Sequence, residues 1–417
     1  IYYINGPLDL TVLMKLYGVE GFEHFKEEPY APQPVPELPG DCDIFGEIRK
    51  RDILLHHPYQ TFAPVVDFIK TAAKDPRVLA IKQTLYRVSG NSPIIAALAQ
   101  AAENGKQVSV LVELKARFDE ENNIVWAKML EKAGVHVIYG LVGLKTHSKI
   151  TLVVRKEEYG IRRYVHLGTG NYNDATAKLY TDLGLLTCRE DIGEDATAVF
   201  NMLSGYSEPR SWNKLSLAPL WLKDRFIYMI ERETKLAKAG MEAKIVAKMN
   251  SLCDREVISA LYAASAAGVK IDLIVRGICC LKTGIPDVSE NITVRSIVGT
   301  FLEHSRIFYF ENGGDEEYYL SSADWMPRNL RRRVEILFPV EQPDLKERIA
   351  HILSCLQKDT LKAQILKADG SYEKVDKRGK ESFGAQKYFC EEAKNLTKAM
   401  EGDILKERVF IPEIHHE

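Results

Sequence analysis

Two segments of this sequence, LAQAAENGKQVSVLVE (Leu98–Glu113) and LYAASAAGVKIDLIVR (Leu261–Arg276), align with each other without a gap. Each one starts with small and apolar residues at helical spacing, passes a glycine, Gly105 or Gly268, and ends in a β-branched run. A helix that ends at a glycine and leads into a buried strand is typical of α/β proteins. The pair therefore predicts an α/β fold that contains an internal duplication.

The similarity continues downstream of both segments. His147 stands two residues before Lys149 and opens the strand-like run ITLVVR, which turns and returns as RRYVHL. His304 stands two residues before Arg306 and opens IFYF, which turns at 312–315 and returns as EEYYL. The Asn-Gly and Gly-Asp steps of this turn favour a hairpin. Since the same features recur in the same order, duplication explains them better than the alternative, a chance likeness between α/β units.

The interval between the two copies is far longer than the roughly 20–50 residues of a solenoid repeat, so each copy is expected to be a whole domain. We place these domains at residues 34–214 and 215–417, each with a mixed sheet flanked by helices. Residues 1–33 would be a remnant of a preceding domain and a linker. Five prolines between Pro29 and Pro39 suit an extended linker. Because the first residue is Ile1 and not Met, we expect a fragment of a longer protein.

Composition excludes several classes of protein. Of the 417 residues, 46% are hydrophobic and 27% are charged, as in globular proteins and unlike disordered or collagenous chains. No apolar run approaches about 18 residues, so we expect no transmembrane segment. With 56 basic and 58 acidic residues the net charge is −2, so a polyanion would be recognised by local clusters of cations. The 7 cysteines form no CxxC pair, which predicts reduced thiols and no structural zinc.

The two repeated histidines are the main candidates for chemistry. A neutral imidazole can attack phosphorus, and a second one can donate or accept a proton because its unperturbed pKa is about 6.5. Residues i and i+2 of a strand share a face, so Lys149 is expected to point where His147 points, and Arg306 where His304 points. This arrangement suits a phosphoryl group attacked by a histidine and held by a cation. The alternative, a purely structural role, is kept for the other eight histidines.

Arginines follow three of the expected strands, at Arg87, Arg117 and Arg276. Open α/β sheets bind ligands beyond the carboxyl ends of their strands, and a guanidinium pairs with two phosphate oxygens. We therefore expect a phosphate-lined channel there, although each arginine taken singly is as well explained as a solvated charge. A further set of cations would extend this path for a polyanion: Lys145, Arg162, Arg163, Arg328, Arg331, Arg332 and Arg333.

Common nucleotide-binding motifs are absent from the sequence. The nearest imitation of a P-loop, GLVGLKT at 140–146, has its lysine one place late, and Gly168-Thr169-Gly170 lacks the third glycine of a dinucleotide fingerprint. There is no G-x-S-x-G and no kinase HRD with DFG. No nucleic-acid-binding module is recognisable either, so no nucleic-acid partner is expected. A bound nucleotide would have to be held in another way.

Longer motifs run through nearly the whole chain: HPY at 57–59, IKQTLYR at 81–87, VLVELKARFDE at 110–120, GLKTHSK at 143–149, GTGNYN at 168–173, LEHSR at 302–306 and ENGGDEEYYLSSADWM at 311–326. Together they strongly resemble the polyphosphate kinases of the long-chain-synthesising type. The resemblance implies two tandem phospholipase D-like domains. It also implies reversible transfer of the terminal phosphate of ATP to inorganic polyphosphate through a phosphohistidine.

The resemblance also implies roles for single residues. It makes His147 the phosphorylated nucleophile and places Tyr180, Arg276 and His304 in contact with ATP. We add Asn171, at the end of the GTGN run, as a phosphate-binding candidate. Lys149 and Arg306 would neutralise phosphate oxygens beside their histidines.

Magnesium is the cofactor that the resemblance implies, at Arg87 and Arg117. A guanidinium offers no lone pair to Mg²⁺, so we expect these arginines to hold the phosphate oxygens that carry the metal. The implied partners are ATP, ADP and polyphosphate, and the implied assembly is a homo-oligomer. We expect a cytoplasmic protein, with peripheral attachment to the inner membrane left open.

Two other functions stay open. One is a phosphodiesterase of the phospholipase D type, which would release an alcohol from a diester without ATP. It is weakened because those enzymes carry an aspartate five residues after the lysine, where this chain has Val154, and because the second copy has Arg306 in place of lysine. The other is an inactive polyphosphate-binding fragment, since the two domains that precede this region in the kinases are missing here.

Overall fold

The computed structural model describes residues 3–26, 28–88, 92–113, 120–141, 143–205, 207, 209–379 and 381–407. The chain divides into two units, residues 1–31 and 32–417, and each is taken by itself. The smaller unit contains α1 (Val12–Tyr17) and the 3₁₀ helix η1 (Glu23–Phe25). Neither helix has a buried residue, so the described part of this unit has no core of its own.

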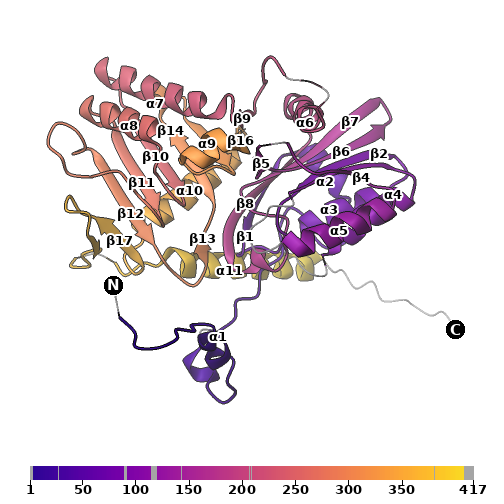
Figure 1. Ribbon diagram of the computed structural model, residues 1–417, viewed down its shortest axis with the longest axis horizontal. Coiled ribbons are helices and arrows are strands. Elements are labelled where there is room, and N and C mark those ends of the chain that lie inside the picture. The colour runs from indigo at the N-terminus through magenta and orange to yellow at the C-terminus, as the bar shows by residue number, and fades with distance from the viewer. Residues whose placement is uncertain are drawn as a thin grey trace. The chain divides into compact units, whose positions relative to one another are not determined.

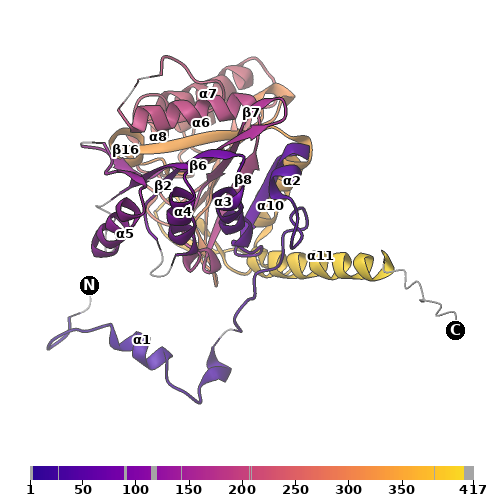
Figure 2. The ribbon, with the colours of Figure 1, turned by 90° about the vertical axis from the view of Figure 1, so that its right-hand side faces the viewer.

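The first repeat of the larger unit is built on one mixed sheet (Figure 1). Its strand order is β1 (Ile53–His57), β8 (Tyr180–Thr187), β7 (Gly160–Gly168), β6 (Lys149–Glu157), β2 (Val78–Leu85), β3 (Gln107–Val112) and β4 (His136–Ile138). Only the pairs β2/β3 and β3/β4 are parallel within this order. Helices cover both faces (Figure 2): α2 (Ile44–Lys50), α3 (Ala63–Lys74), α4 (Pro93–Glu103) and α5 (Glu120–Lys132) on one, α6 (Glu190–Leu203) on the other.

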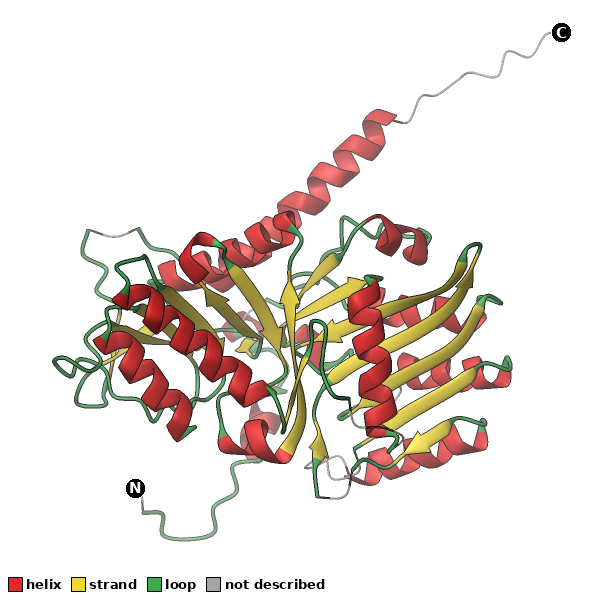
Figure 3. Ribbon diagram, turned by 90° about the horizontal axis from the view of Figure 1, so that it is seen from above, coloured by secondary structure: helices red, strands yellow, loops and turns green. Residues whose placement is uncertain are grey.

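The second repeat has a second sheet with the corresponding order. From one edge it runs β18 (Tyr372–Lys374), β17 (Ala363–Leu366), β12 (Ile292–Ile297), β11 (Lys270–Val275), β10 (Lys244–Met249), β14 (Arg306–Phe310), β15 (Glu317–Ser321) and β16 (Arg333–Val340), with β9 (Ser216–Ala218) also paired to β16. Its helices are α7 (Leu222–Lys238), α8 (Arg255–Ala266), α9 (Pro327–Arg332), α10 (Pro343–Lys358) and α11 (Ala385–Glu407). The order β12-β11-β10-β14-β15-β16-β9 matches β4-β3-β2-β6-β7-β8-β1 of the first sheet. The predicted duplication is confirmed, and Figure 3 shows both sheets with their helices.

The helix-to-strand junctions that predicted the repeat form as expected. Gly105 has φ +79° between α4 and β3, and Gly268 has φ +98° between α8 and β11. Both values lie in the left-handed region, which glycine enters without a steric penalty from a side chain. At the other end of α8, the Asp254 side chain accepts hydrogen bonds from the backbone of Glu256 and Val257 and caps the helix.

Each sheet buries its own apolar core against its helices. In the first repeat Phe45 packs edge-on against Tyr164 with ring centroids 4.7 Å apart. In the second repeat the fully buried Trp325 packs against Phe226 and Phe308, at 5.4 and 5.1 Å. Aromatic side chains of this size contribute most of the burial in such cores. Each repeat therefore has an apolar core of its own that holds its strands and helices in place.

The proline-rich segment behaves differently from a solvated linker. It contains no helix or strand, as its prolines predict, apart from a single bridge between Gln33 and Gln60. However, Val35 is only 1% exposed and joins the core of the first repeat together with Leu38. The apolar side chains between the prolines therefore dock this segment onto the domain that follows it.

Among the described residues, no helix combines the length with the apolar character that crossing a lipid bilayer requires. The longest helix, α11, alternates charged and apolar side chains, and its start packs against both repeats.

Candidate active site between the two repeats

The two repeats exchange short strands at their junction. The strand β5 (Lys145–Thr146) leaves the first repeat and pairs in parallel with β16 of the second sheet. The strand β13 (Leu302–Glu303) leaves the second repeat and pairs in parallel with β8 of the first sheet. Each exchanged strand directly precedes one of the repeated histidines. The exchange therefore brings His147 to the second sheet and His304 to the first.

His147 is held by groups of the second repeat. Its backbone N–H donates to the carbonyl of Val334 at 2.9 Å, and its Nδ1 lies 2.9 Å from Oε2 of Glu335. The ring of Tyr86 packs edge-on against the imidazole, at 4.9 Å between centroids. Burial lowers the pKa of His147 well below its usual value, and the charges of Lys149 and nearby arginines lower it further. A neutral ring that donates Nδ1–H to Glu335 keeps a lone pair on Nε2.

Glu335 is itself held by hydrogen-bond donors. Ser322 donates to its Oε2 at 2.5 Å, and the Asn329 side chain donates to its Oε1 at 2.6 Å. Full burial raises the pKa of Glu335 to about 6, although Lys149 and the Ser322 bond oppose that rise. Above that pH the group is a carboxylate that fixes the orientation and the tautomer of the His147 ring.

His304 has the equivalent arrangement with a carboxylate of the first repeat. Its Nδ1 lies 2.8 and 2.9 Å from the two carboxylate oxygens of Asp182, and Thr169 donates to the same carboxylate at 2.7 Å. Burial acts to raise the pKa of Asp182, but His304, Thr169 and Arg306 outweigh it and the pKa is lowered. Burial also lowers the pKa of His304. The pair is therefore a carboxylate that accepts Nδ1–H from a neutral ring.

Neither of these carboxylates was among the residues predicted from the sequence. Asp182 is the third residue of β8, and Glu335 is the third residue of β16, the corresponding strand of the second repeat. Aligning YTD (180–182) with RVE (333–335) would have found them, because each strand has an acidic residue at the same place among buried residues. Nothing in the sequence indicated that each carboxylate would contact the histidine of the other repeat.

The two predicted cations lie beside their histidines, but in another way than expected. The strands β6 and β14 begin at Lys149 and Arg306, so both histidines lie outside the strands and no shared strand face aligns them. Lys149 instead donates to the carbonyl of His147, and its Nζ lies 5.4 Å from the ring of Tyr86. Arg306 places Nη1 at 3.2 Å from Nε2 of His304. The cations thus lie near their histidines, but not through a shared strand face, because both histidines stand in the segments that cross between the two sheets.

Arg306 also links His304 to a buried acid. Its Nε and Nη2 each lie 3.2 Å from one oxygen of Asp324, whose pKa is lowered to about 2 because the Arg306 ion pair outweighs the effect of burial. Asn250 donates to the same carboxylate from its backbone at 2.7 Å and accepts a bond from Nε of Arg276 at 2.7 Å. Arg276 thus lies in the group of side chains around His304, and its contact with ATP stays a prediction.

The remaining candidates differ in where they lie. Tyr180 packs against His304 with ring centroids 5.3 Å apart. Asn171 lines a small cavity that Asp182 also lines. The Arg87 guanidinium lies 5.7 Å from the ring of Tyr86, which packs on His147. Arg117 lies outside the described residues.

One electrostatic observation joins the two halves of the site. The charges of Lys149 and Arg306 both lower the pKa of His147, and the same two charges lower the pKa of His304. Both histidines thus lie within the electrostatic range of the same two cations, and we call these four side chains the histidine cluster. That the two rings meet around one phosphoryl group stays a prediction.

Four of the further basic residues lie in different surroundings. Arg333 joins the cluster, since its Nη1 lies 3.9 Å from Glu335, and it pairs with Lys145 across the exchanged strands. In contrast, Arg331 is half exposed and pairs with Glu256 at α8, and Arg162 donates to the thiol of Cys188.

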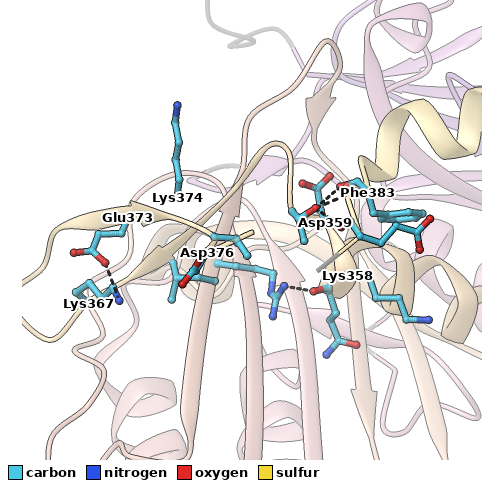
Figure 4. Close-up of a pocket in the computed structure, with 13 residues that line it drawn as sticks. Lys358, Asp359, Lys367, Glu373, Lys374, Asp376 and Phe383 are labelled. Atoms are coloured by element: carbon cyan, nitrogen blue, oxygen red, sulfur yellow. Dashed lines mark hydrogen bonds and ion pairs between the residues drawn. The ribbon is translucent and has the colours of Figure 1, made fainter. Parts of the chain in front are cut away.

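The described residues also form a cavity of about 690 Å³ in the C-terminal part of the chain. It lies between the end of α10, the strands β17 and β18, and the segment before α11 (Figure 4). Its wall contains acidic and basic side chains such as Lys358, Asp359 and Lys374, but none of the predicted site residues. The histidine cluster, and not this cavity, is therefore the candidate active site.

Comparison with known proteins places the chain in a family. Models of polyphosphate kinase C-terminal domain 1 and C-terminal domain 2 match residues 43–209 and 215–386. A polyphosphate kinase of Halalkalibacterium halodurans is 61% identical over 383 residues, which are 91% of this chain and 54% of the relative. That of Lactiplantibacillus plantarum is 55% identical over 407 residues, which are 97% of this chain and 56% of the relative. The chain spans about half the length of the curated relatives it matches.

Solved structures agree with this result. A crystal structure of polyphosphate kinase from Porphyromonas gingivalis has a TM-score of 0.84 at 38% identity and covers 90% of this chain and 57% of that one. Phosphatidylserine synthase from Haemophilus influenzae has a TM-score of 0.50 at 12% identity, over 86% of this chain and 96% of that one, which shows a shared fold alone. The predicted fold of two tandem phospholipase D-like domains is confirmed. The matched domains and the identity over nearly the whole chain show that it belongs to the polyphosphate kinase family.

Proposed function

We propose that this chain carries the phosphoryl-transfer centre of a polyphosphate kinase, which moves the terminal phosphate of ATP reversibly to inorganic polyphosphate. His147 is the residue that becomes phosphorylated. The observation that carries this proposal is the bond of 2.9 Å between Nδ1 of His147 and Glu335, because it leaves Nε2 as the nucleophile. The names of the relatives support the proposed reaction, and the contacts of His147 support its proposed role.

In the first step, Nε2 of His147 attacks the γ-phosphorus of ATP. The N–P bond forms, the bond from phosphorus to the bridging oxygen breaks, and ADP leaves with that electron pair. The phosphorylated ring is more acidic at Nδ1, and the Glu335 carboxylate stabilises the proton there. Lys149 and Arg306 neutralise the phosphoryl oxygens, since positioning and charge stabilisation are the main means of catalysis in phosphoryl transfer.

In the second step, a terminal oxygen of polyphosphate attacks the phosphorus. The N–P bond breaks, and its electron pair returns to Nε2 of His147. His304 takes a proton from the accepting oxygen through its own Nε2, which keeps a lone pair because Asp182 holds the ring proton at Nδ1. Tyr180, Arg276 and Asn171 are proposed to bind the nucleotide and the phosphates.

The described residues do not fit a resident magnesium ion. They include no group of three or more His, Cys, Asp or Glu side chains placed to hold a metal. The guanidinium of Arg87 has no lone pair to offer Mg²⁺. We therefore propose that Mg²⁺ arrives as part of the substrate, Mg–ATP, and that Arg87 and Arg117 hold its phosphate oxygens.

The test is labelling with ATP that carries ³²P in the γ position. It is run on this chain and on a full-length relative, because the chain spans about half of the relatives' length. We expect a label that is stable in alkali, is lost in acid, and disappears in His147→Ala. His136→Ala, at an exposed histidine of β4, is the matched control and should keep the label. An acid-stable label, or one that survives His147→Ala, contradicts the proposal.

Experiments on the same two proteins distinguish two alternative functions from the proposed one. Release of an alcohol from a phosphodiester without ATP would indicate a phosphodiesterase. Steeply salt-dependent polyphosphate binding without phosphohistidine would indicate a binding fragment. We further propose that the domains extend over 34–214 and 215–417, and that the protein is a cytoplasmic homo-oligomer without a nucleic-acid partner.

A further inference from the structure

The helix α11 reaches the chain segment that precedes His304. The side chain of Gln386, in the first turn of α11, is buried. Its Oε1 accepts a hydrogen bond from the backbone N–H of Phe301 at 3.0 Å, and its Nε2 donates to the carbonyl of the same residue at 2.9 Å. Nε2 also donates to Oε1 of Glu303 at 2.7 Å. One amide therefore makes three bonds to the segment 301–303, which ends next to His304.

A glycine in the same loop gives independent support for this contact. A Cβ atom added at Gly299 would lie 2.3 Å from Oε1 and 2.8 Å from Cδ of Gln386. Real Cβ atoms do not approach so closely, so the backbone at this position leaves room only for the amide. The loop before His304 is thus shaped around the Gln386 side chain.

The bond to Glu303 continues to the backbone of His304. Glu303 is buried, lies 3.1 Å from Nζ of the buried Lys248, and accepts a hydrogen bond from Oγ1 of Thr181 at 3.0 Å. The same Thr181 oxygen accepts the backbone N–H of His304 at 3.2 Å. Asp182, the next residue, holds Nδ1 of His304. A continuous set of hydrogen bonds therefore runs from Gln386 through Glu303 and Thr181 to the backbone of His304, and the residue after Thr181 holds the His304 ring.

The start of α11 is itself fixed in place. Asp359 is 1% exposed and accepts the backbone N–H of Ala385 at 2.8 Å with its Oδ2. Its Oδ1 accepts two further backbone bonds, from Lys362 and Ala363. One turn along α11, the ring of Phe389 packs 5.1 Å from the ring of Tyr59 in the first repeat. Gln386 is therefore anchored against both repeats and not on a freely moving helix.

We propose that Gln386 is a positioning residue, which holds the segment 301–303 so that Nδ1 of His304 meets Asp182. The proposal rests on the proposed function of His304 in phosphoryl transfer. It makes α11, which begins one residue before the matched domain ends at 386, a part of the catalytic apparatus.

The substitution Gln386→Glu tests the proposal with almost no change of shape. It puts a carboxylate oxygen where Nε2 donates, facing both the carbonyl of Phe301 and the Glu303 carboxylate. The new carboxylate repels Glu303 and cannot donate a hydrogen bond to it. We expect kcat to fall about 10-fold or more at pH 8, with KM for ATP unchanged. Gln386→Ala should lower kcat as well, with KM for ATP unchanged.

The matched control is Lys387→Ala, at the neighbouring position of α11. The Lys387 side chain is 81% exposed, and its pairing with Glu391 spans 3.9 Å. This variant should keep the kcat and the pH profile of the original chain. Equal kcat values at every pH in Gln386→Glu and in the original chain overturn the proposal.

A second measurement does not depend on catalysis. The ring ¹⁵N resonances of His304, assigned by their loss in His304→Asn, report the bond to Asp182 directly. We expect them to shift in Gln386→Glu at pH 8 and to stay in place in Lys387→Ala. If the chain formed no phosphohistidine, the proposed function would fail while these resonances still tested the positioning. Unchanged His304 resonances in Gln386→Glu would refute the positioning role of Gln386. If a Gln386 variant does not fold, Gly299→Ala takes its place, because the added Cβ displaces the Gln386 amide.

Discussion

The substitution Glu335→Gln addresses the bond on which the proposed nucleophile depends. Glu335 accepts hydrogen bonds from Nδ1 of His147 at 2.9 Å, from Ser322 and from Asn329. An amide of the same shape has one acceptor oxygen instead of two and carries no charge. Either its oxygen stays on His147 and only the charge is lost, or its NH₂ group faces Nδ1 and forces the proton of the ring onto Nε2. In the second case the lone pair that attacks phosphorus is gone.

The size of the effect follows from the type of bond that is lost. A hydrogen bond to a charged group contributes about 1.5–3 kcal/mol, which corresponds to a rate factor of about 10 to 150. The lower value applies if the amide oxygen keeps its place, and the upper value or more applies if the tautomer of His147 changes. Because Asn329 has a buried Oδ1 without a described hydrogen-bond partner, it can turn and accept a bond from the new NH₂ group, which favours the lower value.

The assay is rapid quenching of phosphohistidine formation with γ-labelled ATP. Glu341→Gln is the control, because Glu341 directly follows β16 but pairs with Lys214 and Arg189 away from the histidines. We expect the control to form phosphohistidine at the original rate. If Glu335→Gln also forms it at the original rate, while thermal unfolding shows both variants folded, then Glu335 does not set the tautomer of His147 and the reasoning fails.

Three more outcomes can be checked. The pKa of Glu335 is raised to about 6, so its carboxylate binds a proton as the pH falls through that value. The rate of phosphohistidine formation should therefore fall below pH 6. Stopped assays over pH 5 to 8 should show that this pH dependence is lost in Glu335→Gln. Arg306→Lys should lower the free energy of unfolding by about 1.5–3 kcal/mol in urea titrations, because lysine cannot form both bonds to Asp324. Gly170→Ala would put a Cβ 2.2 Å from an oxygen of Asp182, so transfer to polyphosphate should slow in single-turnover experiments while labelling of the protein persists; an unchanged transfer rate would contradict the role of that carboxylate.

Local sequence patterns were sufficient for the helix-to-strand junctions that define the repeat. The helix, glycine and β-branched run around Gly105 and Gly268 predicted both junctions, because backbone conformation and hydrophobic periodicity act over a few residues. The similarity downstream of these junctions found His147 and His304, since duplicated residues recur in the same order. It did not find that β6 begins only at Lys149, because a strand-like composition does not say at which residue pairing with a neighbour begins.

The sequence by itself determined that this chain is a duplicated α/β protein with two histidines and adjacent cations, since those features depend on residue type and spacing. Only the tertiary structure decided which carboxylate serves which histidine. Glu335 reaches His147, and Asp182 reaches His304, because β5 and β13 cross to the opposite sheets. The physical reason is that these contacts form where the cores of the two repeats pack against each other. That packing depends on shape and burial over surfaces built from segments that are distant in the sequence.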